Sequence, residues 1–378
     1  MQRNRRMAAG GVRRGVRLTL LASLSLLSSC LCRGPAAPRR VVVAAQPAAP
    51  PAEPAMDSEP TFVSMRNVDF HVGGDIVLHI RHLRGLLRGK DGVVNFDQGS
   101  SFVTFVDSAE AGLTAADLTN LMNNHVFAYR GAPLRNINVT LVNNHLIQTG
   151  ILHKGVDIPF KIKSEVSLTS DGRLRLHPVD TDIFCVDGDK LMKALGLSME
   201  KMVDVSKAKG VSIKGNDFII DPIAVLPPPT IRGRVVAVRI DGDQLVQTIG
   251  PAPGEGAGES RFAERPPTPP DTTVRNYMYY RGGKLHFGRK LLMSDADMQV
   301  VDAEQSDPFD FNLDQYMVQL VAGYSRTLAN AGLWVEMPDF HRVFRLEQVA
   351  GGEVTSPRDT ACNCPPPKPP VRGARTKP

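Results

Sequence analysis

The strongest constraint on the fold is an alternation of apolar and polar residues near the middle of the chain. Ile158, Phe160 and Ile162 fall on one side of an extended segment, and lysines fall on the other. Because successive side chains of a strand point to opposite faces of a sheet, this pattern predicts a long strand with one buried face. Ser170-Asp171-Gly172 then has the composition of a tight turn, and the alternation resumes over residues 173–177. The two segments predict a β-hairpin.

The same combination of alternation and turn residues recurs at three other places before residue 250. Asn143-Asn144, Gly215-Asn216-Asp217 and Asp241-Gly242-Asp243 each separate two alternating segments. Successive hairpins predict an antiparallel meander, and the length of its strands predicts strong curvature. We therefore expect an α+β fold that is mainly antiparallel β, in which a strongly curved meander sheet wraps one or two helices.

Two segments with helical spacing interrupt this alternation. Thr114 and Asp117 have the spacing of a capping box, and apolar residues follow them on one helical face. A second helix is expected over residues 189–195, with a continuation over residues 199–205. Its apolar side is rich in methionine, a flexible side chain that fills irregular spaces and would suit the inside of a curved sheet.

The first thirty residues have the features of a bacterial export signal. Arginines precede an apolar run over residues 18–27, which is too short to span a bilayer, and Leu27-Ser28-Ser29-Cys30 resembles a lipobox. We predict a signal peptide over residues 1–29 and lipidation of Cys30, which would tether an exported protein to the bacterial cell envelope on its periplasmic or outer-membrane side. The alternative is an ordinary cleaved signal peptide that leaves a free thiol.

Composition divides the rest of the chain. The proline- and alanine-rich residues 30–60 predict an extended tether, and residues 61–250 are expected to form the curved-sheet domain. Residues 251–273 predict a flexible linker, and residues 350–378 predict a disordered tail rich in proline.

The region between linker and tail, residues 274–349, is predicted to be a β-rich extension packed on the first domain. Arg281-Gly282-Gly283 is expected to form a turn between two of its strands. Aromatic residues concentrate in this region and would make an adhesive surface if they were exposed, so we expect them to be buried. They are Tyr277, Tyr279, Tyr280, Phe287 and Trp334.

The charge of the chain argues against a nucleic-acid partner. The formal net charge is +6, but six arginines and no acidic residue precede Cys30, so cleavage there leaves a chain with no net charge. The remaining sequence has no basic stripe interleaved with aromatic residues, the usual signature of nucleic-acid binding. Protein partners cannot be identified from these residues.

The sequence lacks the motifs of common catalytic and metal sites. It contains no G-x-S-x-G nucleophile motif and no H-E-x-x-H motif. Isolated histidines on strands are interpreted as solvent-facing residues. An acidic cluster in the extension lacks the glycine and the closing glutamate of an EF-hand, and it is interpreted as a solvated face; its members are Asp295, Asp297, Asp302, Glu304, Asp307, Asp310 and Asp314. We therefore predict no catalytic residue, no metal site and no cofactor.

A series of segments between Asp107 and Gly250 carries a family resemblance. The segments are Gly112–Leu118, the strand pair after it, Gly150–Phe160, Asp171–Leu176 and the Met/Leu helix that follows. Together they resemble bacterial envelope proteins of the tubular lipid-binding (TULIP-like) superfamily. The resemblance implies a curved antiparallel sheet that wraps a helix and leaves an apolar tube for lipid acyl chains.

These observations predict an exported lipoprotein that binds a lipid or another apolar ligand without catalysis. The residues expected to line the ligand site are Leu118, Leu121, Met122, Ile158, Phe160, Ile162, Leu191, Leu195, Met199 and Met202. One alternative is a structural or interaction protein of the envelope whose core is filled by its own side chains. A hydrolase is a second alternative, disfavoured by the missing nucleophile motif.

Overall fold

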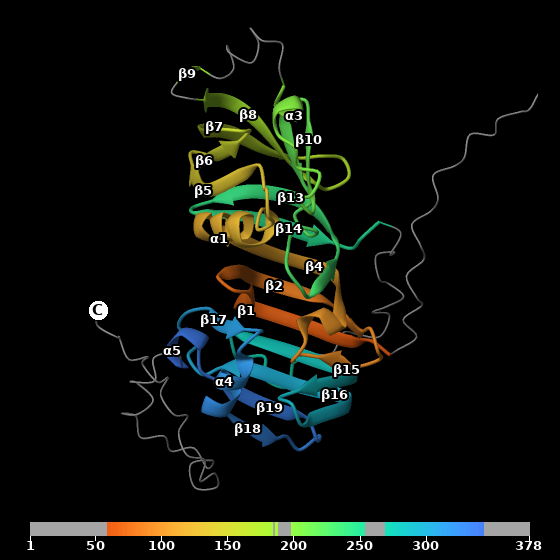
Figure 1. Ribbon diagram of the computed structural model, residues 1–378. Coiled ribbons are helices and arrows are strands. Elements are labelled where there is room, and N and C mark those ends of the chain that lie inside the picture. The colour runs from red at the N-terminus through yellow and green to blue at the C-terminus, as the bar shows by residue number, and fades with distance from the viewer. Residues whose placement is uncertain (1–58, 184–185, 188–197, 254–268, 344–378) are drawn as a thin grey trace, which may run out of the picture. The chain divides into compact units, whose positions relative to one another are not determined.

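The structure is a computed structural model that describes residues 59–183, 186–187, 198–253 and 269–343. Cys30, the predicted signal peptide, nearly all of the predicted tether and the predicted tail lie outside the described residues. In the described part, two β-sheets carry most of the chain (Figure 1).

Sheet A has twelve strands. They are β1 (Thr61–Gly73), β2 (Ile76–Gly89), β3 (Val94–Asn95), β4 (Phe102–Thr114), β12 (Thr230–Arg232), β13 (Arg234–Asp241), β14 (Gln244–Gly250), β15 (Tyr277–Phe287), β16 (Leu291–Asp302), β17 (Phe309–Asn312), β18 (Tyr324–Thr327) and β19 (Leu333–Met337). Its main path runs β13-β14-β4-β2-β1-β15-β16-β19-β18, and β12, β17 and β3 add parallel pairings to β4, β1 and β15.

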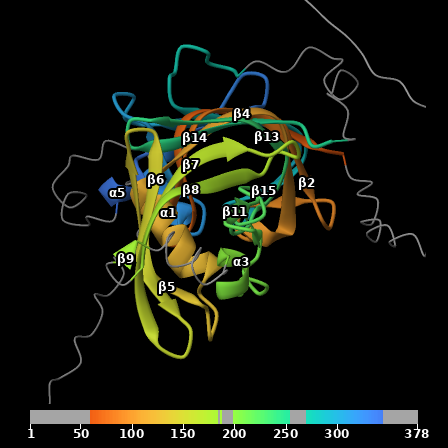
Figure 2. The same ribbon diagram turned by 90° about the horizontal axis from the view of Figure 1, so that it is seen from above.

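Sheet B has seven strands. They are β5 (Leu134–Val142), β6 (His145–His153), β7 (Asp157–Leu168), β8 (Leu174–Ile183), β9 (Val186–Asp187), β10 (Val211–Lys214) and β11 (Asp217–Ile220). The order β10-β11-β8-β7-β6-β5 is antiparallel throughout, and β9 pairs with β8. The sheet is strongly curved (Figure 2). The predicted class, mainly antiparallel β with a curved sheet around a helix, is confirmed.

The predicted helix over residues 189–195 lies outside the described residues, and within those residues the helices are few and short. They are α1 (Ala115–Leu121), α3 (Met199–Met202), α4 (Tyr316–Ala322) and α5 (Phe340–Val343), together with a 3-10 turn η1 (Gly99–Ser101) and a π-helical turn η2 (Met122–Val126). Among the described residues, no helix has both the length and the apolar character needed to span a bilayer.

The predicted hairpins of sheet B form at the expected turns. Asn143 and Asn144 both have positive φ angles, 49° and 60°, between β5 and β6. Gly172, with φ of 83°, lies in the turn between β7 and β8. These are the residue types that adopt left-handed backbone conformations most readily, so local chemistry sets the register of both hairpins.

The prediction of one continuous meander is wrong. The hairpin of β13 and β14 forms as expected, but β14 pairs with β4 and therefore belongs to sheet A. The chain leaves sheet B after β11 through Pro222 and Pro227-Pro228-Pro229. Proline has no N–H to donate to a sheet ladder, so this segment cannot continue sheet B and the next strands pair elsewhere.

Helix α1 connects the two sheets. It begins at the predicted capping box, in which the Thr114 hydroxyl accepts from the Asp117 N–H and the Asp117 carboxylate accepts from the Thr114 N–H. Leu118 and Leu121 are buried, and the helix contacts β2, β4 and β5. Figure 2 shows α1 within the curve of sheet B. Buried apolar residues of both sheets and of α1 form one continuous cluster.

The C-terminal strands complete sheet A. β15 pairs antiparallel with β1 and β17 pairs parallel with it, so the middle of the sheet combines the first strand of the described chain with strands from its C-terminal region. Tyr279, Tyr280, Phe287 and Trp334 are buried as predicted, and Tyr277 is half-buried.

The turn predicted inside this region is wrong, because β15 is one strand from Tyr277 to Phe287. Gly282 and Gly283 adopt positive φ angles, 75° and 62°, within it. A Cβ atom at Gly283 would lie 2.5 Å from the Thr61 hydroxyl oxygen. The two glycines therefore allow β15 to approach the start of β1 closely, and they permit an irregularity within the strand. Such an irregularity has the same local sequence as a turn.

Candidate functional site

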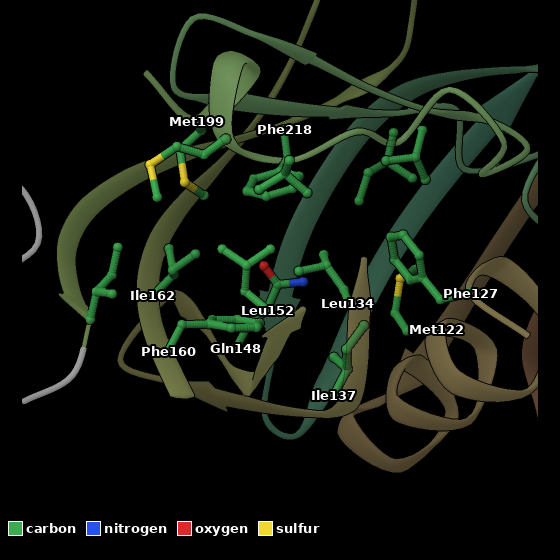
Figure 3. A pocket seen from close by; sticks show the side chains of 15 residues that line it. Met122, Phe127, Leu134, Ile137, Gln148, Leu152, Phe160, Ile162, Met199 and Phe218 are labelled. Carbon is green, nitrogen blue, oxygen red and sulfur yellow. The ribbon is translucent and has the colours of Figure 1, made fainter. Parts of the chain in front are cut away.

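The concave face of sheet B forms one wall of an apolar cavity (Figure 3). Leu152 of β6, Ile162 of β7 and Ile183 of β8 contribute to this wall. The cavity encloses about 630 Å³, counting the space open to solvent at its mouth. All but one of its lining residues are apolar; they are Met122, Phe127, Leu134, Ile137, Gln148, Leu152, Phe160, Ile162, Ile183, Met199, Met202, Val203, Val211, Phe218 and Ile220.

The opposite wall includes the short helix α3. Met199 and Met202 line the cavity from this helix. The helix ends at Met202, whereas a continuation to residue 205 was expected. Val203 has extended φ and ψ angles of −121° and 113°, and burial then alternates, with Val203 and Val205 buried and Asp204 exposed. Burial with a period of two is typical of an extended strand and not of a helix. The helix therefore ends before Val203, whose β-branched side chain lies in the cavity.

Two further apolar cavities lie beside the first and share lining residues in series. One, of about 470 Å³, lies against α1 and shares Met122, Gln148 and Ile220 with it. Another, of about 550 Å³, reaches the sheet A strands β2 and β4 and shares Pro222 and Gln247 with the second. Each is narrow, because side chains occupy most of the space between its walls. An acyl chain would therefore enter only where flexible side chains such as methionine move apart.

The residues predicted to line a ligand site are distributed over these cavities. Met122, Phe160, Ile162, Met199 and Met202 line the first, and Leu118 and Leu121 line the second together with Met122. Ile158 packs against the core but does not line the first cavity. Leu191 and Leu195 lie outside the described residues.

Other lining residues were not predicted. Phe218 alternates with Ile220 in a strand that the sequence does predict, so this pattern carried a signal for its burial. Phe127 follows the π-helical turn and belongs to no periodic pattern. Its place in the cavity depends on how that turn redirects the chain.

Polar groups gather on the same face of sheet B as the cavity wall. Gln148 lies opposite Ile162, and its carboxamide points into the cavity (Figure 3). Thr181 lies opposite Ile162 on the other side, and Ser164 follows two residues later on β7. The hydroxyls of Ser164 and Thr181 are buried without a hydrogen-bond partner among the described residues. A buried hydroxyl without a hydrogen-bond partner destabilises the fold by about 1–3 kcal/mol. A hydrogen bond from it to a polar ligand atom or to a water would therefore be favourable.

A charged cluster lies where α1 meets sheet A. His79 Nδ1 is 2.8 Å from Asp69 Oδ1, and His79 Nε2 is 3.2 Å from Asp117 Oδ2. Both ring nitrogens can donate only in the imidazolium form. Burial lowers the pKa of His79, but the hydrogen bonds and charges of Asp117 and Asp69 outweigh it and raise the pKa to about 10. The prediction that strand histidines face solvent is wrong for His79, which is half-buried and joins β1, β2 and α1.

This cluster predicts a pH dependence of stability. Because the pKa of His79 is higher in the folded chain than its ordinary value of 6.5, its stabilising contribution is complete below pH 6.5 and is lost as the pH rises through about 10. Chemical denaturation should show that the wild type loses on the order of 3 kcal/mol more unfolding free energy than His79→Gln over this interval. His82→Gln, an exposed residue of the same strand, should behave as wild type. Equal slopes for wild type and His79→Gln would contradict the ion pairing.

The acidic cluster of the extension is not simply a solvated face. Asp302 and Asp310 are buried, and burial raises the pKa of Asp302 to about 7. Asp310 contacts two histidines, with Oδ1 2.5 Å from His71 Nε2 and Oδ2 2.7 Å from His341 Nδ1. The strand pairing that buries β17 against β1 is long-range, which explains why the sequence pattern did not indicate it.

One group of side chains beside this cluster has the spacing of metal ligands. Asp307, Asp339 and His341 each place one ligand atom within 4.8 Å of the others. Arg342 lies 3.3 Å from Asp339 Oδ2 and 3.6 Å from Asp307 Oδ1. Its guanidinium pairs with both carboxylates and also with Glu304, so we interpret the group as an ion-pair network.

The described residues thus contain a set of apolar cavities with shared walls and two buried charged clusters. The cavities combine apolar walls with few polar groups, which is the usual character of a small-molecule site. Comparison with known proteins adds no further assignment: no protein-family model, no curated protein and no solved structure matches this chain.

Proposed function

We propose that the protein binds a lipid acyl chain, or a similar apolar ligand, in the cavities under the curved sheet, without catalysing a reaction. The observation that carries the proposal is the series of apolar cavities with shared walls that runs from sheet B along α1 to sheet A. Burying each CH₂ group of a ligand contributes about 0.8 kcal/mol, so a chain of ordinary length supplies several kcal/mol before ordering costs. The sequence resemblance to tubular lipid-binding proteins favours the same function.

The proposal includes a location. A signal peptide followed by a lipid on Cys30 would hold the protein at the bacterial cell envelope, with residues 30–60 as a tether. More than one acyl chain is needed for stable membrane attachment, and lipoprotein modification supplies several. A binding domain on such a tether would work close to a membrane that contains its ligand.

Mass spectrometry of the full chain purified from its own host tests both parts. Under native conditions we expect an additional mass, removable by organic solvent, that corresponds to a bound lipid. After denaturation we expect the chain to begin at Cys30 and to retain the mass of covalent acyl groups. A native spectrum without added mass, repeated after incubation with host lipid extract, would contradict ligand binding. A chain that retains residues 1–29, or that carries an unmodified Cys30, would contradict the anchor.

The second candidate is a structural or interaction protein of the envelope with a self-filled core. The narrowness of the cavities favours it, because side chains already occupy most of the space between the walls. The two candidates differ in whether the walls tolerate a charge, a difference that substitution at Met199 can measure.

A further inference from the structure

A hollow with mixed polar and apolar lining lies directly beside the first apolar cavity. It encloses about 1350 Å³, counting space open to solvent, and it shares Met202, Val203 and Val211 with the apolar cavity. These three residues thus line both spaces. This hollow, which we call the vestibule, is also lined by Tyr129, Gly131, Pro133, His153, Lys154, Glu200, Lys201, Asp204, Val205, Ser206, Lys207, Ser212 and Ile213.

The vestibule presents more available positive than negative charge. Its three lysines, Lys154, Lys201 and Lys207, make no ion pair among the described residues, and Lys154 Nζ donates only to the Lys201 carbonyl oxygen at 3.3 Å. Its two carboxylates are directed to backbone donors. Glu200 Oε2 accepts from the Gly215 N–H at 2.9 Å, and Asp204 Oδ1 accepts from the Ser206 N–H at 3.0 Å.

Hydrogen-bond donors accompany the lysines. The Tyr129 hydroxyl is buried at the wall of the vestibule without a hydrogen-bond partner among the described residues. Ser212 adds a hydroxyl to the lining, and the Ser206 side chain hydrogen-bonds to the Asp204 carboxylate. Ammonium and hydroxyl donors around a space open to solvent are suited to the oxygen atoms of an anion, whereas the adjoining cavity has mainly apolar walls.

We propose that the vestibule binds the anionic headgroup, a phosphate or a carboxylate, of a lipid whose acyl chain occupies the apolar cavity. This inference rests on the proposed lipid-binding function and specifies its ligand as an anionic amphiphile. The chain would pass between Met202, Val203 and Val211, and the headgroup would lie near Lys201 and Lys207.

Isothermal titration calorimetry of the full chain in detergent-free buffer tests the proposal with three probes. They are dodecyl phosphate, dodecanol of equal chain length, and inorganic phosphate. At low salt we expect dodecyl phosphate to bind about tenfold more tightly than dodecanol, and we expect high salt to reduce this preference because the lysines are exposed. Inorganic phosphate alone should bind far more weakly than dodecyl phosphate.

The double variant Lys201→Gln, Lys207→Gln should lose the preference and retain the wild-type affinity for dodecanol. Both side chains are exposed and form no ion pair with another residue that the structure describes, so the variant should unfold at the wild-type temperature. Lys284→Gln, an exposed lysine of sheet A, is the matched control and should keep the preference.

The possible outcomes separate this inference from the function on which it rests. If neither alkyl probe binds to the wild type, lipid binding itself is contradicted. If the two alkyl probes bind equally well, or if the double variant keeps the preference, lipid binding stands and the vestibule is not a headgroup site. If inorganic phosphate binds as tightly as dodecyl phosphate, the vestibule is a site for a free anion.

Discussion

A chain that ends at Gly250 should fail to form a stable monomer. In the full chain β1 lies between β2 and β15, and Phe70 of β1 stacks on Phe311 of β17 with ring centroids 5.6 Å apart. Truncation would remove β15 and β17 and leave one side of β1 without a partner. Exposing a large apolar side chain to water costs about 1.5–3 kcal/mol. Exposing a few of them would therefore cost as much as the unfolding free energy of a typical domain, which is about 5–15 kcal/mol. Size-exclusion chromatography and apolar-dye fluorescence should show aggregation and strong dye binding.

A cleaved chain provides the control for this truncation. A protease site inserted between Gly254 and Gly258 would cut the connection and keep every strand. Because β1 and β15 pair through backbone hydrogen bonds that do not depend on this segment, the two pieces should elute together after cleavage. A truncated chain that is monomeric, does not bind dye and is as heat-stable as the full chain would show that residues 274–349 form a separate module.

Met199→Glu should leave the protein folded and should reduce affinity for an apolar ligand by about 100-fold or more. Met199 is 4 % exposed and lines the first cavity, and its neighbours Met202 and Val203 line both this cavity and the vestibule. A carboxylate at this position could reach water when the ligand is absent, but it would have to be desolvated when an acyl chain is bound. Circular dichroism should report the fold, and displacement of a fluorescent fatty acid should report the affinity.

The matched control is the same substitution in a core without a cavity. Met278 of β15 has no exposed surface and lines none of the apolar cavities described above. Met278→Glu should therefore prevent folding, because the charge has neither water nor a partner. If Met199→Glu unfolds in the same way, the cavity is a self-filled core and the structural alternative is favoured over ligand binding.

The candidate site was only partly predictable from the sequence. Phe160 and Ile162 were found because a strand exposes alternate residues to one face, and Leu118 and Leu121 because a capped helix has a regular spacing. The vestibule was not predicted, since Lys154 and Lys201 are far apart in the sequence and adjoin only after sheet B curves. The carboxylates around His79 likewise come from β1 and α1, which no local pattern connects.

The sequence by itself determined the features that depend on neighbouring residues. Asn143-Asn144 and Gly172 specify turns because few residue types adopt positive φ, and Thr114 and Asp117 specify the start of α1 because they satisfy its free N–H groups. The tertiary structure alone decided which hairpin joins which sheet and that Gly282-Gly283 lies inside a strand. It also decided that Asp302 and Asp310 are buried. Those outcomes depend on pairings between distant strands, whose energies are set by the partner that each strand meets and not by its own sequence.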